Sequence, residues 1–179
     1  GLGDLANTNY TITLSDTPVD FTINALAVTV IPDANQAKTY GDADPTFTYT
    51  TTPSLVGTDS FTGLMDRAAG SDVGTYALGL GDLANTNYTI TLDATPVDFT
   101  INTKAVTVTP DGGQAKTYGD ADPALTYGSL GVESGDSFTG SLSRDAGSDV
   151  GDYTINQNTL ALSAKPMVSI TESLSLNIR

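Results

Sequence analysis

The sequence predicts an all-β protein made of two tandem small β-sandwich domains, preceded by a hairpin that belongs to a further repeat. Three observations predict this fold: a long internal repeat, apolar residues that recur with a period of two, and turn-forming residues at short intervals. A β-grasp-like arrangement is the alternative, but the helix that it needs is hard to find in the sequence.

The internal repeat sets the domain organisation. Residues 1–24 and 79–102 differ at only two positions, and the match continues from Ala27 at the same offset of 78 residues. One residue is missing from the later copy after Tyr49, so the offset becomes 77 from there on. A repeat of this length indicates tandem domains rather than a solenoid, whose units have about 20–45 residues.

Within each copy the apolar residues alternate with polar ones, which predicts β-strands. Tyr88, Ile90 and Leu92 form one alternating set, and Phe99 and Ile101 belong to the next. These Thr-rich and aromatic runs end at Gly, Pro or Asp about every eight to twelve residues, which is typical of strands joined by turns. About six short strands in a copy make a small Ig-like sandwich or a partly open barrel.

The composition excludes several classes of function. The net charge is −14 with only seven basic residues, which argues against nucleic acid and anionic membrane surfaces as partners. All 21 acidic residues except Glu133 and Glu172 are Asp, a residue that favours turns. Because the chain has no Cys and no His, it cannot form disulfides, Ser-His triads or the usual zinc sites. The sequence contains no run of about 18 apolar residues, so it predicts no membrane-spanning helix.

The decamer QAKTYGDADP stands at residues 36–45 and again at 114–123. We interpret it as a structural turn, in which Gly41 supplies a positive φ and the Asp side chains close local turns. Lys38 is expected to lay its stem over the sheet and to pair with an Asp. Tyr40 is expected to lie partly over the core, with its hydroxyl bonded at the edge. Its counterpart in the second decamer is expected to do the same.

Calcium binding is the alternative interpretation of these turns. Ca²⁺ takes six to eight oxygen ligands, and the sequence supplies carboxylates but no contiguous ligand loop. The candidate ligands are Asp42, Asp44 and Asp72 in the first copy and Asp120, Asp122 and Asp149 in the second. A catalytic carboxylate pair needs a cleft and two differently tuned acids, and nothing in the sequence marks either. We therefore expect no enzyme and no cofactor other than candidate calcium ions bound at these turns.

Several longer segments resemble a known family. AVTVTPDGGQAKTYGDADPALTYG, SGDSFTGSLSRDAGSDVGDYTI, NYTITL and VDFTI are similar in order and spacing to the MBG-type repeat of the YGX class. Such repeats occur in long arrays in large secreted bacterial proteins, including filamentous-haemagglutinin-like adhesins. The resemblance implies a location outside the cell or on the bacterial surface and a structural or adhesive role, and it supplies no catalytic residues.

The resemblance also indicates where each copy of the repeat begins and ends. It divides the chain into residues 1–24, the C-terminal hairpin of a preceding repeat, residues 25–102, the first copy, and residues 103–179, the second copy. The last hairpin of the second copy, 163–178, has drifted in sequence. Short junctions without Gly or Pro favour limited bending between neighbouring repeats over floppy linkers.

Two functions follow as expectations. The first is a stalk that holds a distal binding region of an adhesin away from the cell. The alternative is an adhesive module that binds a glycan or a host protein, with Tyr10, Tyr49, Tyr88 and Tyr127 as candidate contacts. We also expect residues 1–24 to support self-association, because an isolated hairpin leaves apolar side chains and strand edges without partners.

Overall fold

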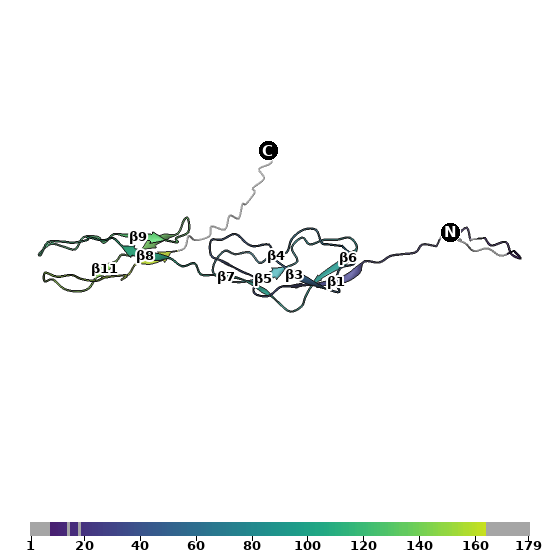
Figure 1. The fold of residues 1–179 in the computed structure, drawn as a ribbon, viewed down its shortest axis with the longest axis horizontal. Coiled ribbons are helices and arrows are strands. Elements are labelled where there is room, and N and C mark those ends of the chain that lie inside the picture. Colours follow the sequence, from purple (N-terminus) through teal and green to yellow (C-terminus); the bar gives the residue numbers. More distant parts are fainter. Residues whose placement is uncertain (1–7, 14, 18, 164–179) are drawn as a thin grey trace, which may run out of the picture. The chain divides into compact units, whose positions relative to one another are not determined.

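The computed structural model describes residues 8–13, 15–17 and 19–163. All regular structure in this part of the chain is β (Figure 1). This confirms the all-β prediction, and the helix that a β-grasp arrangement needs is absent from the described residues. The same residues contain no helix with the length and apolarity that a bilayer crossing requires.

The first copy contains a three-stranded sheet with β1 (Leu26–Pro32) in the centre. On one side β3 (Tyr49–Thr52) pairs with it in antiparallel orientation, and on the other side β6 (Tyr88–Leu92) pairs with it in parallel. The register places Thr29 opposite Thr91, and their hydroxyl oxygens lie 3.4 Å apart. The first and the penultimate strand of the copy are therefore neighbours in the sheet.

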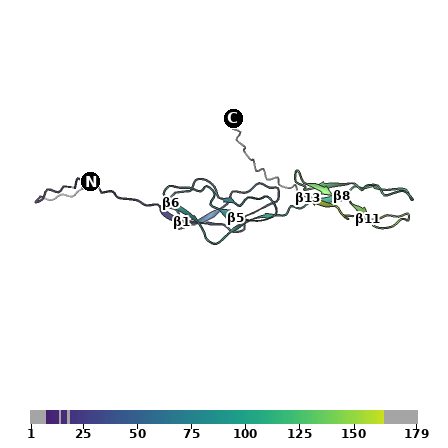
Figure 2. The ribbon, with the colours of Figure 1, turned by 180° about the vertical axis from the view of Figure 1, so that it is seen from behind.

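A second sheet of four strands has the order β2-β7-β5-β4. Its strands are β2 (Ala37–Thr39), β7 (Asp98–Asn102), β5 (Gly74–Gly79) and β4 (Asp66–Arg67). Figure 2 shows β1, β5 and β6 from behind. Because β6 belongs to one sheet and β7 to the other, the C-terminal segment of the copy ties the two sheets together.

The two sheets contribute to one apolar core, as the sandwich prediction requires. Phe47 meets Phe99 edge to face, with ring centroids 5.2 Å apart. Phe99 and Ile101 of β7 alternate with polar residues and have no exposed surface, because successive strand residues point to opposite faces. The buried apolar residues of these sheets and their loops are Val28, Val30, Phe47, Met65, Leu78, Tyr88, Phe99 and Ile101.

Compared with the first copy, the described part of the second copy, residues 103–163, has shorter strands and fewer buried apolar residues. Its described strands form the antiparallel pairs β8 (Thr107–Pro110) with β9 (Tyr127–Leu130), β10 (Ser137–Thr139) with β13 (Ala161–Ser163), and β11 (Ser143–Arg144) with β12 (Ile155–Asn156). Leu142 and Leu160 are the apolar residues buried in this part of the structure. Residues 164–178, most of the drifted hairpin, lie outside the described part.

The chain divides into two compact units. The first unit consists of residues 1–36, 45–70 and 75–100, and the second of residues 37–44, 71–74 and 101–179. The division between the units near the end of the first copy falls after Thr100. The second unit also includes two loops, 37–44 and 71–74, that the sequence assigns to the first copy.

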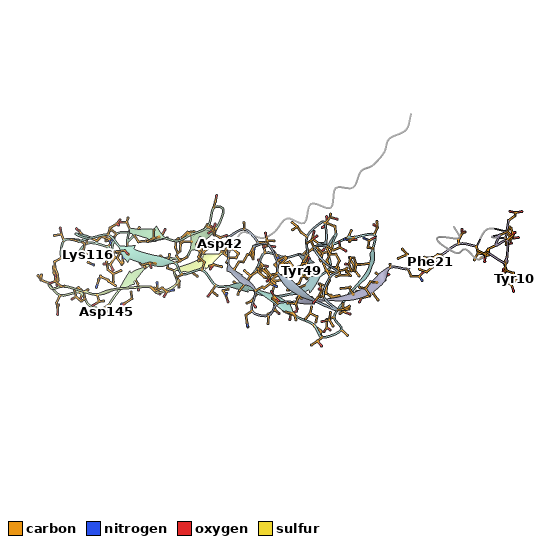
Figure 3. The ribbon with its side chains drawn as sticks, turned by 45° about the vertical axis from the view of Figure 1, so that its right-hand side comes forward. Tyr10, Phe21, Asp42, Tyr49, Lys116 and Asp145 are labelled. Atoms are coloured by element: carbon orange, nitrogen blue, oxygen red, sulfur yellow. The ribbon has the colours of Figure 1, made fainter. Side chains whose placement is uncertain are left out.

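The described residues between 8 and 24 form no strand longer than a single bridge position at Tyr10. Their large apolar side chains are exposed, as Figure 3 shows for Tyr10 and Phe21. The predicted hairpin includes residues 1–7, 14 and 18, which lie outside the described part.

Candidate functional site

The glutamine that opens each decamer acts as a clamp on the neighbouring hairpin. Gln36 Nε2 donates to the carbonyl oxygens of Asp33 and Thr48 at 2.9 and 3.0 Å, and its Oε1 accepts from the Thr48 amide at 2.8 Å. Gln114 makes the same three bonds, to Asp111 and Thr126, at 2.7–3.0 Å. One side-chain amide thus satisfies three backbone groups in both copies.

The lysine of each decamer pairs with the second aspartate of the same turn, which confirms the pairing expected for Lys38. Lys38 Nζ lies 2.6 Å from Asp44 Oδ1, and Lys116 Nζ lies 2.6 Å from Asp122 Oδ1. The Lys38 side chain is only 10% exposed, so its stem is covered while its charge is matched. Each pair closes its turn across six residues.

In the second copy an arginine, Arg144, joins the Lys116–Asp122 pair, and we call the clamping glutamine, the Lys–Asp pair and the arginine of each copy the polar cluster. Arg144 binds the Asp122 carboxylate through two nitrogens, and its Nη1 donates to the carbonyl oxygens of Asp145 and Gly147 at 3.0 and 2.8 Å. The hydrogen bonds from Lys116 and Arg144 hold the pKa of the Asp122 carboxyl below its ordinary value. Figure 3 labels Lys116 and Asp145, which belong to the two loops of this cluster.

Arg144 and its counterpart in the first copy, Arg67, each stack on a tyrosine ring. The guanidinium carbon of Arg67 lies 4.9 Å from the ring centroid of Tyr76, and that of Arg144 lies 4.7 Å from the ring centroid of Tyr153. Arg67 Nη1 also donates to the carbonyl oxygens of Ala68 and Gly70, as Arg144 does to the corresponding loop. The segment DRAAGSD and its counterpart SRDAGSD are therefore held by side chains of their own copy.

The Tyr-Gly pair inside the decamer differs between the copies. Tyr40 is half-buried, and its hydroxyl lies 3.5 Å from Asp136 Oδ1 within the second unit. Removal from solvent, together with the Asp136 carboxylate, raises the pKa of Tyr40. Tyr118 is 71% exposed, so the expectation that it lies over the core is wrong. A Cβ on Gly41 would meet the Glu133 side chain, whereas one on Gly119 would meet open space.

Lys104 and Glu133 form an ion pair beside Tyr40 that the sequence analysis did not single out. The hydrogen bond to Glu133 raises the pKa of Lys104. Together with Val73, Val106 and other residues of the second unit, these side chains line a pocket of about 400 Å³. The pocket is open to solvent, and its lining is mostly apolar apart from the paired Lys104 and Glu133 and the acidic groups near Tyr40.

The six aspartates proposed as calcium ligands lie in different settings. Asp44 and Asp122 are paired with lysines. The main-chain amides of Asp42 and Asp120 each close a turn by donating to a threonine carbonyl oxygen at 3.1 Å. Asp149 accepts the Tyr153 hydroxyl with its main-chain oxygen, and Asp72 acts on the charge environment of Tyr40. The described residues contain no group of three or more Asp, Glu, His or Cys side chains suited to a metal ion.

The aromatic residues proposed as binding contacts fall into two groups. Tyr88 is buried, its hydroxyl donates to Asp59 Oδ2 at 2.7 Å, and this bond raises its pKa. Tyr49 stacks on Phe61, and Tyr127 meets Phe138 edge to face at 5.4 Å. Tyr49 and Tyr127 are half-buried, whereas Tyr10 is 74% exposed.

Most of the cluster was not found from sequence, and the reason is physical. The partners of Gln36 and Arg67 are mainly backbone carbonyls, whose positions depend on the fold. The available signal was the recurrence of both residues in the repeat, Gln36 at an offset of 78 residues and Arg67 at an offset of 77.

The fold and these contacts together define a tandem pair of small all-β modules, in which the recurring polar side chains bind main-chain groups or one another. The family model described as MBG domain (YGX type) matches residues 28–100 and 106–165. The chain belongs to this family, and its two matched segments form a tandem MBG repeat. MBG domains are typically found as repeat modules in extracellular proteins. Comparison with curated proteins and with solved structures gave no match.

Proposed function

We propose that the chain is a spacer segment of a bacterial surface adhesin, which holds a distal binding region away from the cell. The observation that carries this proposal is the use of the recurring residues. Gln36, Lys38 and Arg67 and their counterparts bind partners within the fold. A motif that repeats because it stabilises each module suits a spacer, in which every copy has the same task.

The surroundings of Tyr40 support the same proposal. The loops 37–44 and 71–74 of the first copy belong to the compact unit that holds the second copy. Gly41 lies so close to Glu133 that a side chain in its place would collide. Two loops of the earlier copy thus pack with residues of the later one, which suits modules that follow one another in an array. In this proposal the chain is secreted or displayed on the cell surface and carries no catalytic centre.

Small-angle X-ray scattering tests the spacer function. We would compare the chain with forms in which residues 25–102 are inserted once or twice more after Asn102. The maximum dimension should rise by the same increment with each inserted copy. An increment that shrinks with each insertion would show a collapsed or flexible chain and would overturn the spacer proposal.

One observation favours the adhesive alternative. Tyr118 is 71% exposed in the same turn as Asp120, and tyrosine, with an apolar ring and a polar hydroxyl, is enriched at binding interfaces. A glycan array probed with the whole chain would test it, with Tyr118→Ala as the matched variant. Binding that the variant loses would favour the adhesive module over the spacer.

A further inference from the structure

Nearly the same sequence occupies two different environments in this chain. Residues 8–24 repeat the sequence of the β6–β7 segment except at two positions. In β7, Phe99 and Ile101 have no exposed surface. Their counterparts Phe21 and Ile23 are 89% and 87% exposed. A segment that fits an apolar groove in one place therefore presents the same side chains to solvent in the other.

The second unit has a groove at the position that β6 and β7 fill in the first copy. In the first copy Val28 and Val30 of β1 are buried, whereas their counterparts in the second copy, Val106 and Val108, are only half-buried. Among the described residues, β9 is the only strand that pairs with β8, whereas β1 has partners on both sides. The groove has a volume of about 430 Å³, and its apolar lining includes Val106, Val108, Phe138, Leu142, Ile155 and Leu160.

We propose that residues 8–24 of a second molecule of this chain fill this groove by strand addition. The incoming segment lies parallel to β8, as β6 lies parallel to β1. Phe21 and Ile23 then cover the apolar lining in the way that Phe99 and Ile101 cover the core of the first copy. The interaction buries exposed apolar side chains and pairs with the edge of β8 that no described strand occupies.

The first copy also fixes the register of this addition. Thr29 of β1 lies opposite Thr91 of β6, with their hydroxyl oxygens 3.4 Å apart. The counterparts at an offset of 78 residues are Thr107 in the groove and Thr13 in the incoming segment. The proposal therefore places Thr13 of one molecule opposite Thr107 of the other.

The sequence favours residues 8–24 over the chain's own later segment as the occupant. Lys165 and Pro166, which lie outside the described residues, stand where β6 has Tyr88 and Thr89. Proline has no amide hydrogen to donate to a strand ladder, and a lysine carries a charge to a position where Tyr88 is buried. Residues 8–24 keep tyrosine and threonine at both positions.

The donor and the acceptor are different surfaces, so the association is heterologous and joins molecules head to tail. Sedimentation velocity over a range of concentrations should show a series of oligomers of the whole chain. Phe21→Asp should abolish this series, because it places a charge in the apolar groove. Thr22→Asp carries the same added charge on the opposite face of the segment and should retain it. A monomer at every concentration, or equal effects of both variants, would overturn the proposal.

Cysteine cross-linking tests the register, since the sequence contains no cysteine. A mixture of Thr13→Cys and Thr107→Cys chains should form an intermolecular disulfide under mild oxidation, because the two side chains meet. Thr13→Cys mixed with Thr109→Cys is the off-register control and should yield much less. If the chain's own later segment fills the groove instead, a Thr107→Cys and Val168→Cys double variant will close an intramolecular disulfide, and the proposal is refuted.

Discussion

Arg144 holds Asp122 with two donors, Nε to Oδ2 at 3.0 Å and Nη2 to Oδ1 at 3.0 Å. Lys116 Nζ approaches the same carboxylate to 2.6 Å. Bidentate, charge-assisted bonds of this kind restrict both partners in orientation as well as distance. One carboxylate therefore fastens the decamer of the second copy to the loop that follows Arg144.

Acidification should break the ion pairs of Asp122 with Lys116 and Arg144 and so lower the stability of the fold. Because the pKa of Asp122 is lowered in the folded protein, its ionised form stabilises the fold above the unfolded-state pKa. That contribution is lost as the pH falls through the lower, folded-state pKa. Asp122→Asn should thus lower the thermal midpoint at pH 7, and its midpoint should converge with that of the parent chain in acid. Asp152→Asn removes the same charge elsewhere, and an equal loss in that control would contradict the assignment.

Gly140 should not tolerate a side chain. Its φ is +76°, and a Cβ there would lie 2.1 Å from the main-chain oxygen of Thr159. Gly63 has the same conformation and a similar approach to Asp82 in the first copy, so the constraint repeats. Gly140→Ala should cost about 1–3 kcal/mol in the free energy of unfolding. Gly112→Ala, with open space around it, is the control in urea denaturation and should remain near the parent value.

The fold was predictable where the pattern is local. The alternation of Phe99 and Ile101 with polar residues indicated a strand with one buried face, and the structure buries both residues. The Lys38–Asp44 pair was also predictable, because turn residues that are close in sequence have few partners to choose from.

Identical sequence did not predict identical surroundings. Tyr40 and Tyr118 share the same decamer, yet one is half-buried beside Asp136 and the other is exposed. The difference depends on what lies against each turn, which a pattern inside the decamer cannot report. Phe21 and Phe99 differ in the same way, since burial requires a sheet to pack on and not only the right alternation.

Truncating these two phenylalanines should therefore have unequal effects. Phe99→Ala should lower the free energy of unfolding by about 3–5 kcal/mol, because it removes a fully buried ring that packs on Phe47. Phe21→Ala should change it by less than about 0.5 kcal/mol in dilute protein. Both variants keep the flanking sequence Asp-x-Thr-Ile-Asn, so each controls for the other. Similar losses from both would show that residues 8–24 pack in the monomer.

Calcium should have little effect on stability, because the Asp44 and Asp122 carboxylates already have cationic partners. Millimolar Ca²⁺ should move the thermal midpoint only slightly, and equally for the parent chain and for Asp120→Asn combined with Asp122→Asn. A specific site at 100 times its Kd would contribute about 2.7 kcal/mol, which is several degrees for a domain of this size. Differential scanning calorimetry measures this directly, with Mg²⁺ as the control ion. A saturable, calcium-specific shift of that size, lost in the double variant, would establish the turns as calcium sites and refute the structural interpretation.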